Sequence, residues 1–211
     1  MWAIMSSPLI IGTDVRTLNA ANLAIYSNPA VIALNQDPSG SAATRVWRNI
    51  CNDTDVYGQC ETALWVRSLA NGDFAIALLN GANSTMNMTA TAEDIFVYND
   101  LTGTSKPGPQ ISSTWDIHDL WANRMSNDES QAILNANSTT GADILANSTT
   151  RYNATATSYA EGLMANATAL MGVKIGQLTP SGTFTAEVAR HSVGLFRLRQ
   201  VAATVRKRDE L

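Results

Sequence analysis

The hydrophobic pattern changes near Gly40, and this change constrains the fold more than any other feature of the sequence. Before it, residues 7–12 (Ser-Pro-Leu-Ile-Ile-Gly) predict a short strand whose apolar residues 9–11 are continuous, which is typical of a buried parallel strand. Helical signals follow at residues 19–26, and Asn28-Pro29 provides an N-cap and a first helical residue. Residues 1–41 therefore predict one βα unit, which cannot be a domain alone because its parallel strand lacks a neighbour.

After Gly40 the chain consists of short strand-like runs separated by turns. Residues 64–69 and 74–79 flank Asn71-Gly72-Asp73 and predict a hairpin with a tight turn. Further runs alternate between apolar and polar residues, as expected of strands with one buried and one solvated face. These runs are residues 84–90, 184–188 and 196–199, and in the last of them Arg197 and Arg199 fall on the polar face. We predict a mainly β fold, an antiparallel sandwich over residues 42–200.

One segment interrupts this pattern. Residues 127–171 are rich in Asn, Ser, Thr and Ala, and they predict a glycosylated insertion with one short helix near residues 158–170. Residues 201–211 form a charged tail that we expect to be mobile.

Composition excludes several classes of protein. The formal net charge is −4 and only 15% of residues are charged, so nucleic acid is not an expected partner. No apolar run approaches the ~20 residues that span a bilayer. The two cysteines, Cys51 and Cys60, could close a small loop. Zinc would need further ligands, and the chain has only His118 and His191, so we favour a disulfide over metal.

Glycosylation motifs favour the secretory pathway. Together with a disulfide, seven N-x-[ST] motifs are typical of a secreted glycoprotein. The seven acceptor residues are Asn52, Asn83, Asn87, Asn137, Asn147, Asn153 and Asn166. The N-terminus has no signal-peptide pattern, so we expect an N-terminal part of the protein to be missing. The C-terminal residues Arg208, Asp209, Glu210 and Leu211 resemble a Lys-Asp-Glu-Leu retention signal, and a coincidental charged tail is the alternative.

Few constellations of residues could carry chemistry. No G-x-S-x-G, P-loop or G-x-G-x-x-G motif occurs. Candidate carboxylates are Asp53 with Asp55, and Asp116 with Asp119 around His118. Asp116 and His118 could act as an acid/base or metal pair, but we favour a cross-strand hydrogen bond or a solvated face, because a metal needs three or four ligands.

Single residues offer weaker candidates. Four tryptophans, Trp47, Trp65, Trp115 and Trp121, could stack on sugar rings, although we favour core positions for them. Asp14 follows the first strand at a position typical of barrel catalytic residues, but we favour its capping the next turn or pairing with Arg16. For His191 we expect a structural role.

Several longer stretches of the sequence resemble a known protein family. They are similar to the last barrel strand, the last barrel helix and the C-terminal domain of the clan-D, family 27 α-galactosidases (melibiases), fungal members above all. The stretches are residues 2–16, 31–40, 77–81, 113–124 and 191–199, in colinear order.

The resemblance implies a (β/α)8 barrel followed by an antiparallel β-sandwich. It also implies retaining hydrolysis of terminal α-D-galactosides in oligosaccharides or polysaccharides, through two aspartates on earlier barrel strands. Those strands are not represented here, so no catalytic, cofactor-binding or metal residue carries over. Fungal relatives tend to have Gly where this chain has Cys60, which supports a bridge to Cys51 peculiar to this branch.

The hypothesis is therefore a fragment of an α-galactosidase, inactive alone, in which residues 1–41 are a remnant of the barrel. One alternative is a non-catalytic sandwich that binds carbohydrate or packs against a partner. A glycosylated stalk or adhesin fits the glycosylation motifs but fits the strand pattern poorly.

Overall fold

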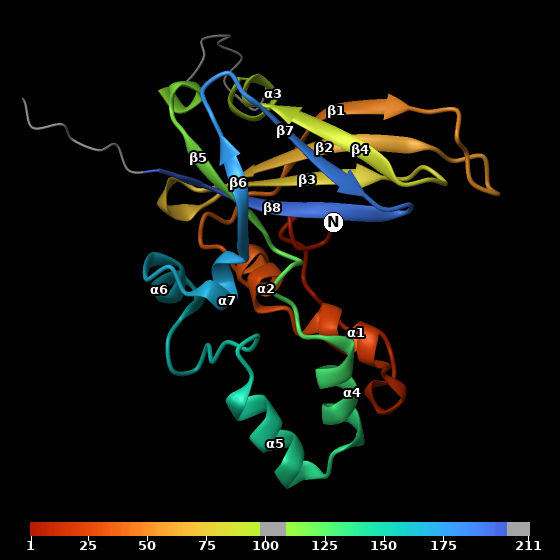
Figure 1. The fold of residues 1–211 in the computed structure, drawn as a ribbon, viewed down its shortest axis with the longest axis vertical. Helices are drawn as coiled ribbons and strands as arrows, with labels where there is room; N and C mark the ends of the chain where they lie inside the picture. The colour runs from red at the N-terminus through yellow and green to blue at the C-terminus, as the bar shows by residue number, and fades with distance from the viewer. Residues whose placement is uncertain (98–108, 202–211) are drawn as a thin grey trace, which may run out of the picture.

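The computed structural model describes residues 1–97 and 109–201, in which two β-sheets lie at one end and most of the helices at the other (Figure 1). The strands are β1 Thr44–Ile50, β2 Glu61–Ser68, β3 Phe74–Asn80, β4 Met86–Thr91, β5 Trp115–Asp119, β6 Val173–Leu178, β7 Thr183–Val188 and β8 Ser192–Gln200. The α-helices are α1 Ala20–Tyr26, α2 Pro29–Asn35, α3 Ala92–Phe96, α4 Asn127–Asn135, α5 Ser138–Asn147, α6 Tyr159–Met164 and α7 Thr168–Met171. Short 3-10 turns occur at Val15–Thr17, Ala70–Gly72 and Pro109–Ser112.

The two sheets form the predicted antiparallel sandwich. Six strands pair in the order β1-β2-β3-β8-β5-β6, and β4 pairs with β7 in a smaller sheet. The β2–β3 hairpin is confirmed, and its turn places Asn71 and Gly72 at φ of 60° and 75°. Because this left-handed region favours Asn and Gly, the sequence specifies the turn directly.

A hydrophobic core fills the space between the two sheets, and we call it the sandwich core. Ile76 and Leu78 of β3 are fully buried there against Met88 and Val188 of the smaller sheet. Aromatic rings close one end of this core. They are Phe74, Phe96 and Trp115, with ring centroids 4.9–5.4 Å apart.

The opposite side of the large sheet is covered by the N-terminal residues, and we call it the helix-covered face. Ile4 and Leu34 are fully buried against Ala75 of β3 and Leu195 of β8. Strand β3 is thus buried on both sides, which explains why residues 74–79 are an unbroken apolar run.

Helices α1 and α2 confirm the N-terminal helical prediction. The side chains of Asn19 and Asn28 cap α1 and α2, and Pro29 is the first residue of α2. The strand expected at residues 9–11 is wrong, because these residues form no strand and their side chains are 41%, 75% and 51% exposed. A parallel strand needs adjacent strands for its hydrogen bonds, and none lies beside it in the described residues.

The insertion at residues 127–171 contains more helix than predicted. Helices α6 and α7 occupy the segment where one helix was expected, and α4 and α5 precede them. Ser126 and Asn137 are N-caps of α4 and α5, so the Asn- and Ser-rich composition that indicates low complexity instead supplies helix starts. Of the tail, only Val201 is described, and the expectation for the remainder lies outside the described residues.

Candidate functional site

A cluster of charged side chains lies buried between the large sheet and its helical cover. We call it the arginine layer, and it consists of Asp37, Arg67, Asp73, Arg197 and Arg199. Asp73 pairs with Arg197 at 3.0 Å and with Arg199 at 2.6 Å. Breaking a buried ion pair of this kind would leave an uncompensated charge in a buried position, which is costly.

The arginine layer ties separate segments together. Arg67 of β2 donates from Nη1 to the backbone oxygens of Ala3 at 3.2 Å and Leu34 at 2.8 Å. Arg199 of β8 donates to the backbone oxygen of Leu163 in α6 at 2.8 Å. Arginines on the sheet therefore hold both the N-terminal segment and the insertion.

Arg197 lies on a buried face, and the prediction of a solvated face is wrong for this residue. The alternation of β8 predicts a solvated face, whereas Arg197 is 0% exposed because the N-terminal residues cover that face. Burial lowers the pKa of its guanidinium, and the Asp73 carboxylate opposes that effect. One signal was available, since Arg67 directly follows four consecutive apolar residues, 63–66, in the predicted hairpin.

Asp14 has the modest role favoured from the sequence. Its carboxylate pairs with exposed Arg16 at 2.8 Å and accepts the Arg16 backbone N–H at 3.0 Å, capping a 3-10 turn. The Arg16 side chain lowers the pKa of Asp14.

Asp116 and His118 both lie on β5, and Asp116 makes side-chain contacts to the neighbouring strand. Asp116 pairs with Lys174 of β6 at 2.7 Å and accepts a hydrogen bond from Gln177 at 2.8 Å. Burial lowers the pKa of His118. Asp119 accepts the backbone N–H of Trp121 at 2.8 Å. The cross-strand alternative is confirmed, and in the described part of the chain no three His, Cys, Asp or Glu residues group as metal ligands.

The loop between β1 and β2 accounts for the other carboxylate pair. Cys51 and Cys60 form a disulfide with Cα atoms 5.2 Å apart. Inside the loop, Asp55 accepts the backbone N–H groups of Tyr57 and Gln59, each at 2.9 Å, and the Gln59 contact is the largest cause of its lowered pKa. Asp53 accepts a hydrogen bond from the Ser84 hydroxyl. Both carboxylates therefore shape loops.

The four tryptophans serve mainly in packing. Trp115 is buried in the sandwich core, and Trp47 packs against its edge. Trp65 and Trp121 pack against the helix-covered face. Of the four, Trp121 lines the two cavities described below. His191 lies exposed at positive φ in the turn before β8.

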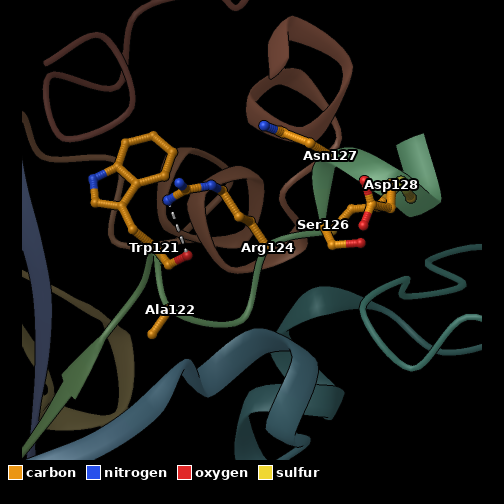
Figure 2. Close-up of a pocket in the computed structure, with 7 residues that line it drawn as sticks. Trp121, Ala122, Arg124, Ser126, Asn127 and Asp128 are labelled. Atoms are coloured by element: carbon orange, nitrogen blue, oxygen red, sulfur yellow. Dashed lines mark hydrogen bonds between the residues drawn. The ribbon is translucent and has the colours of Figure 1, made fainter. Parts of the chain in front are cut away.

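Two cavities open on the described surface. A polar one of about 440 Å³ is shown in Figure 2. It is lined by Trp121, Ala122, Arg124, Met125, Ser126, Asn127 and Asp128. Arg124 lies beside the Trp121 indole, while Asp128 lies next to Ser126, at the end of the cavity away from Trp121. The second cavity, of about 720 Å³, is mainly apolar and includes residues 9–13, Ile25 and Tyr26 in its lining. Neither described cavity is lined by two carboxylates.

All seven asparagines of the predicted glycosylation sites are exposed. They remain predictions. Asn166 also accepts a hydrogen bond from Arg199, which connects its loop to the arginine layer. In the part of the chain that the structure describes, no helix is long and apolar enough to cross a membrane.

Sequence models of two protein regions match the chain in order. Residues 1–37 match the model described as α-galactosidase A, and residues 59–141 match the α-galactosidase C-terminal β-sandwich domain. An α-galactosidase of Saccharomyces mikatae is 48% identical over 95% of the chain. Alpha-galactosidase 2 of Saccharomyces cerevisiae is 47% identical over 96% of it. The chain spans 40% of the length of each of these relatives.

Solved structures give the same result. An α-galactosidase from Saccharomyces cerevisiae superposes with a TM-score of 0.83 at 44% identity, covering 95% of this chain and 42% of the other. The α-galactosidase I of Mortierella vinacea has a TM-score of 0.56 at 26% identity, with coverage of 95% and 34%. Sandwich and preceding helices thus define the C-terminal region of a glycoside hydrolase. Within that class, the chain corresponds to the C-terminal part of the yeast family 27 α-galactosidases, the melibiases.

Proposed function

We propose that this chain is the supporting C-terminal portion of a retaining α-galactosidase, and that it does not hydrolyse galactosides alone. The whole protein would release terminal non-reducing α-D-galactose from oligosaccharides or polysaccharides. The observation that carries the proposal is the order of the two family matches, with residues 1–37 from the catalytic region and residues 59–141 from the sandwich.

The apolar cavity supports this assignment. Ile10 and Ile11 are exposed beside it, although their side chains are of the type that a buried barrel strand carries. Adjacent strands of a barrel would cover such a surface and supply the strand pairing that residues 9–11 do not make in the described residues.

The acidic residues of this chain support its inactivity. Retaining hydrolysis needs two carboxyl groups about 5–5.5 Å apart across a cleft, one of them a free nucleophile. Here Asp14, Asp73 and Asp116 are each paired with a cationic side chain. We infer that the two catalytic aspartates lie on parts of the whole enzyme to which this chain does not correspond.

The test is complementation of a split enzyme. The purified chain should not turn over a chromogenic α-galactoside. Activity should appear when it is co-expressed with the remaining N-terminal portion of a relative, such as α-galactosidase 2 of Saccharomyces cerevisiae. The matched control is this chain without residues 1–37, which should restore nothing. Turnover by the chain alone that is abolished by a substitution within it would contradict the proposal.

A second candidate function is carbohydrate binding at the polar cavity. It is favoured by the lining, since an indole, a guanidinium, an amide and a carboxylate are groups that recognise sugars. Titration of tryptophan fluorescence with galactose and raffinose should then show saturation that Trp121→Phe or Arg124→Ala removes. Trp2→Phe, at a side chain that is 65% exposed and outside this cavity, is the control.

We also propose that the whole protein enters the secretory pathway. This rests on seven exposed acceptor asparagines and the Cys51–Cys60 disulfide. The chain, secreted from yeast behind an added signal peptide, should lose apparent mass on enzymatic removal of N-glycans. An unchanged mass would refute the proposal.

A further inference from the structure

Two buried guanidinium groups in the arginine layer each leave one edge without a hydrogen-bond acceptor in the described residues. The atoms are Nε and Nη2 of Arg67 and of Arg197. The two side chains are 1% and 0% exposed, so bulk water does not reach them. A buried donor without a partner costs about 1–3 kcal/mol, and more when charged, so native proteins rarely leave one unsatisfied.

The free edge has the geometry that binds anions. The N–H groups on Nε and Nη2 of one guanidinium are roughly parallel and form a fork that matches an anion. Arg199 shows this binding mode in the same layer, because its Nε donates to Oδ1 of Asp73 at 3.0 Å and its Nη2 contacts Oδ2 at 2.6 Å. Arg67 and Arg197 have the same fork and use only Nη1 for their described contacts.

Strand register brings the two forks to one place. Arg67 of β2 pairs with Ala75 of β3, and Ala75 pairs with Arg197 of β8. Directly paired residues on antiparallel strands face the same side, so the three side chains form one row on the helix-covered face. Two strand spacings separate the arginines by about 10 Å at Cα. Ala75 contributes only a methyl group between them, which leaves the central position without a long side chain.

The charges of the layer do not balance. It holds three guanidinium groups against the carboxylates of Asp37 and Asp73. Asp73 is engaged by Arg197 and Arg199, and Asp37 accepts the backbone N–H groups of Ser39 and Ala70 at 3.0 and 2.9 Å. The layer therefore carries one more positive than negative charge, with Arg199 half-buried at 21% side-chain exposure and Arg67 and Arg197 fully buried.

We propose that a small inorganic anion, such as chloride, binds between Arg67 and Arg197 beneath the N-terminal helices. An anion accepts hydrogen bonds from the free forks and also brings a negative charge. A water molecule would accept hydrogen bonds there but would bring no charge. Because Arg67 and Arg197 are 1% and 0% exposed, an occupant that reaches both is small and diffusible. The proposal is independent of the α-galactosidase assignment and does not fail with it.

Anomalous diffraction on the unmodified chain provides the direct test. Crystals grown in sodium bromide should show an anomalous peak within hydrogen-bonding distance of Nε and Nη2 of both Arg67 and Arg197. Water-sized density without an anomalous signal at that position would overturn the proposal, as would bromide bound only at the surface.

Thermal unfolding provides a second test in solution. At constant ionic strength, replacing gluconate by chloride should raise the Tm by about 2–4 °C with saturation, as expected when a ligand binds only the folded state. Arg67→Met and Arg197→Met should lose this chloride dependence. Arg48→Met, at an exposed arginine of β1, is the matched control and should retain it. An identical chloride response in all four proteins would overturn the proposal.

Discussion

The two faces of the six-stranded sheet are buried by different means. On the sandwich core side, aliphatic and aromatic side chains pack against β4, β7 and α3. On the helix-covered face, alanines, leucines and Ile4 pack beside the arginine layer, which binds backbone oxygens of the N-terminal segment and of α6. Apolar packing is non-directional, whereas buried ion pairs and hydrogen bonds require particular positions. The first face thus holds the two sheets together, and the second joins the large sheet to the N-terminal segment and to α6.

Substitution of Asp73 should have the largest effect on stability, because Asp73 holds the ion pairs of the helix-covered face. Asp73→Asn keeps the shape of the side chain but removes its negative charge. That charge compensates Arg197, which is buried, and Arg199, which is half-buried. We expect a loss of about 3–5 kcal/mol of unfolding free energy in urea denaturation, because a buried charge is left unpaired.

The control is Asp14→Asn, which breaks the exposed pair with Arg16. It should leave the unfolding free energy close to that of the unsubstituted chain, because exposed ion pairs contribute little to stability. If both variants lost equally little unfolding free energy, the arginine layer would not stabilise the contact between the large sheet and the segments that cover it.

Truncation in the sandwich core should be nearly as costly. Ile76→Ala removes a side chain that is 0% exposed in the centre of β3 and leaves a cavity. The expected cost is about 2–5 kcal/mol by the same measurement. Ile50→Ala on β1, at a side chain that is 69% exposed, should change stability by less than about 0.5 kcal/mol. Equal costs at the two isoleucines would mean that the core is not packed as described.

Two helix caps sharpen the comparison on the helix-covered face. Asn28 accepts the N–H groups of Ala30 and Val31 and also donates to the backbone oxygen of Leu120 at 2.9 Å. Asn19 caps α1 without a long-range contact among its described hydrogen bonds. We expect Asn28→Ala to cost about 1–2 kcal/mol.

Asn19→Ala should cost about half as much, near the low end for a cap. Differential scanning fluorimetry can rank the two. A larger loss of Tm in Asn19→Ala would show that the contact between Asn28 and Leu120 does not stabilise the packing of α2 on the large sheet.

The smallest expected effect is a pH dependence at His118. Burial lowers its pKa in the folded state, so the unfolded chain binds a proton more readily. The contribution of His118 is therefore fully present above its unfolded pKa of about 6.5, and it is lost as pH falls from there through the folded pKa.

His118→Gln should flatten the decline in Tm below pH 6.5. The carboxylates with lowered pKa values, such as Asp14, titrate in a more acidic range and leave this window clear. His191→Gln is the matched control and should leave the decline in place, and an unchanged decline in His118→Gln would contradict the prediction.

The sandwich could be predicted from the sequence because its signals are local. Alternation in β4 and β7 and the Asn71-Gly72 turn need no distant partner to be recognised. The helix-covered face could not, since Arg197 is buried by residues almost two hundred positions away in the chain. The failed strand at residues 9–11 has the same origin, because its pattern describes a barrel environment that this chain does not supply.

Strand β3 belongs to both faces at once, and this has a consequence for hydrogen exchange. Its backbone amides pair with β2 and β8, and each side of the strand has its own cover. Opening either cover alone leaves the β3 ladder intact, so its amides exchange only when the whole molecule unfolds. Deuterium uptake at residues 75–79 therefore reports global stability, while uptake in α2 or β4 reports the detachment of one cover.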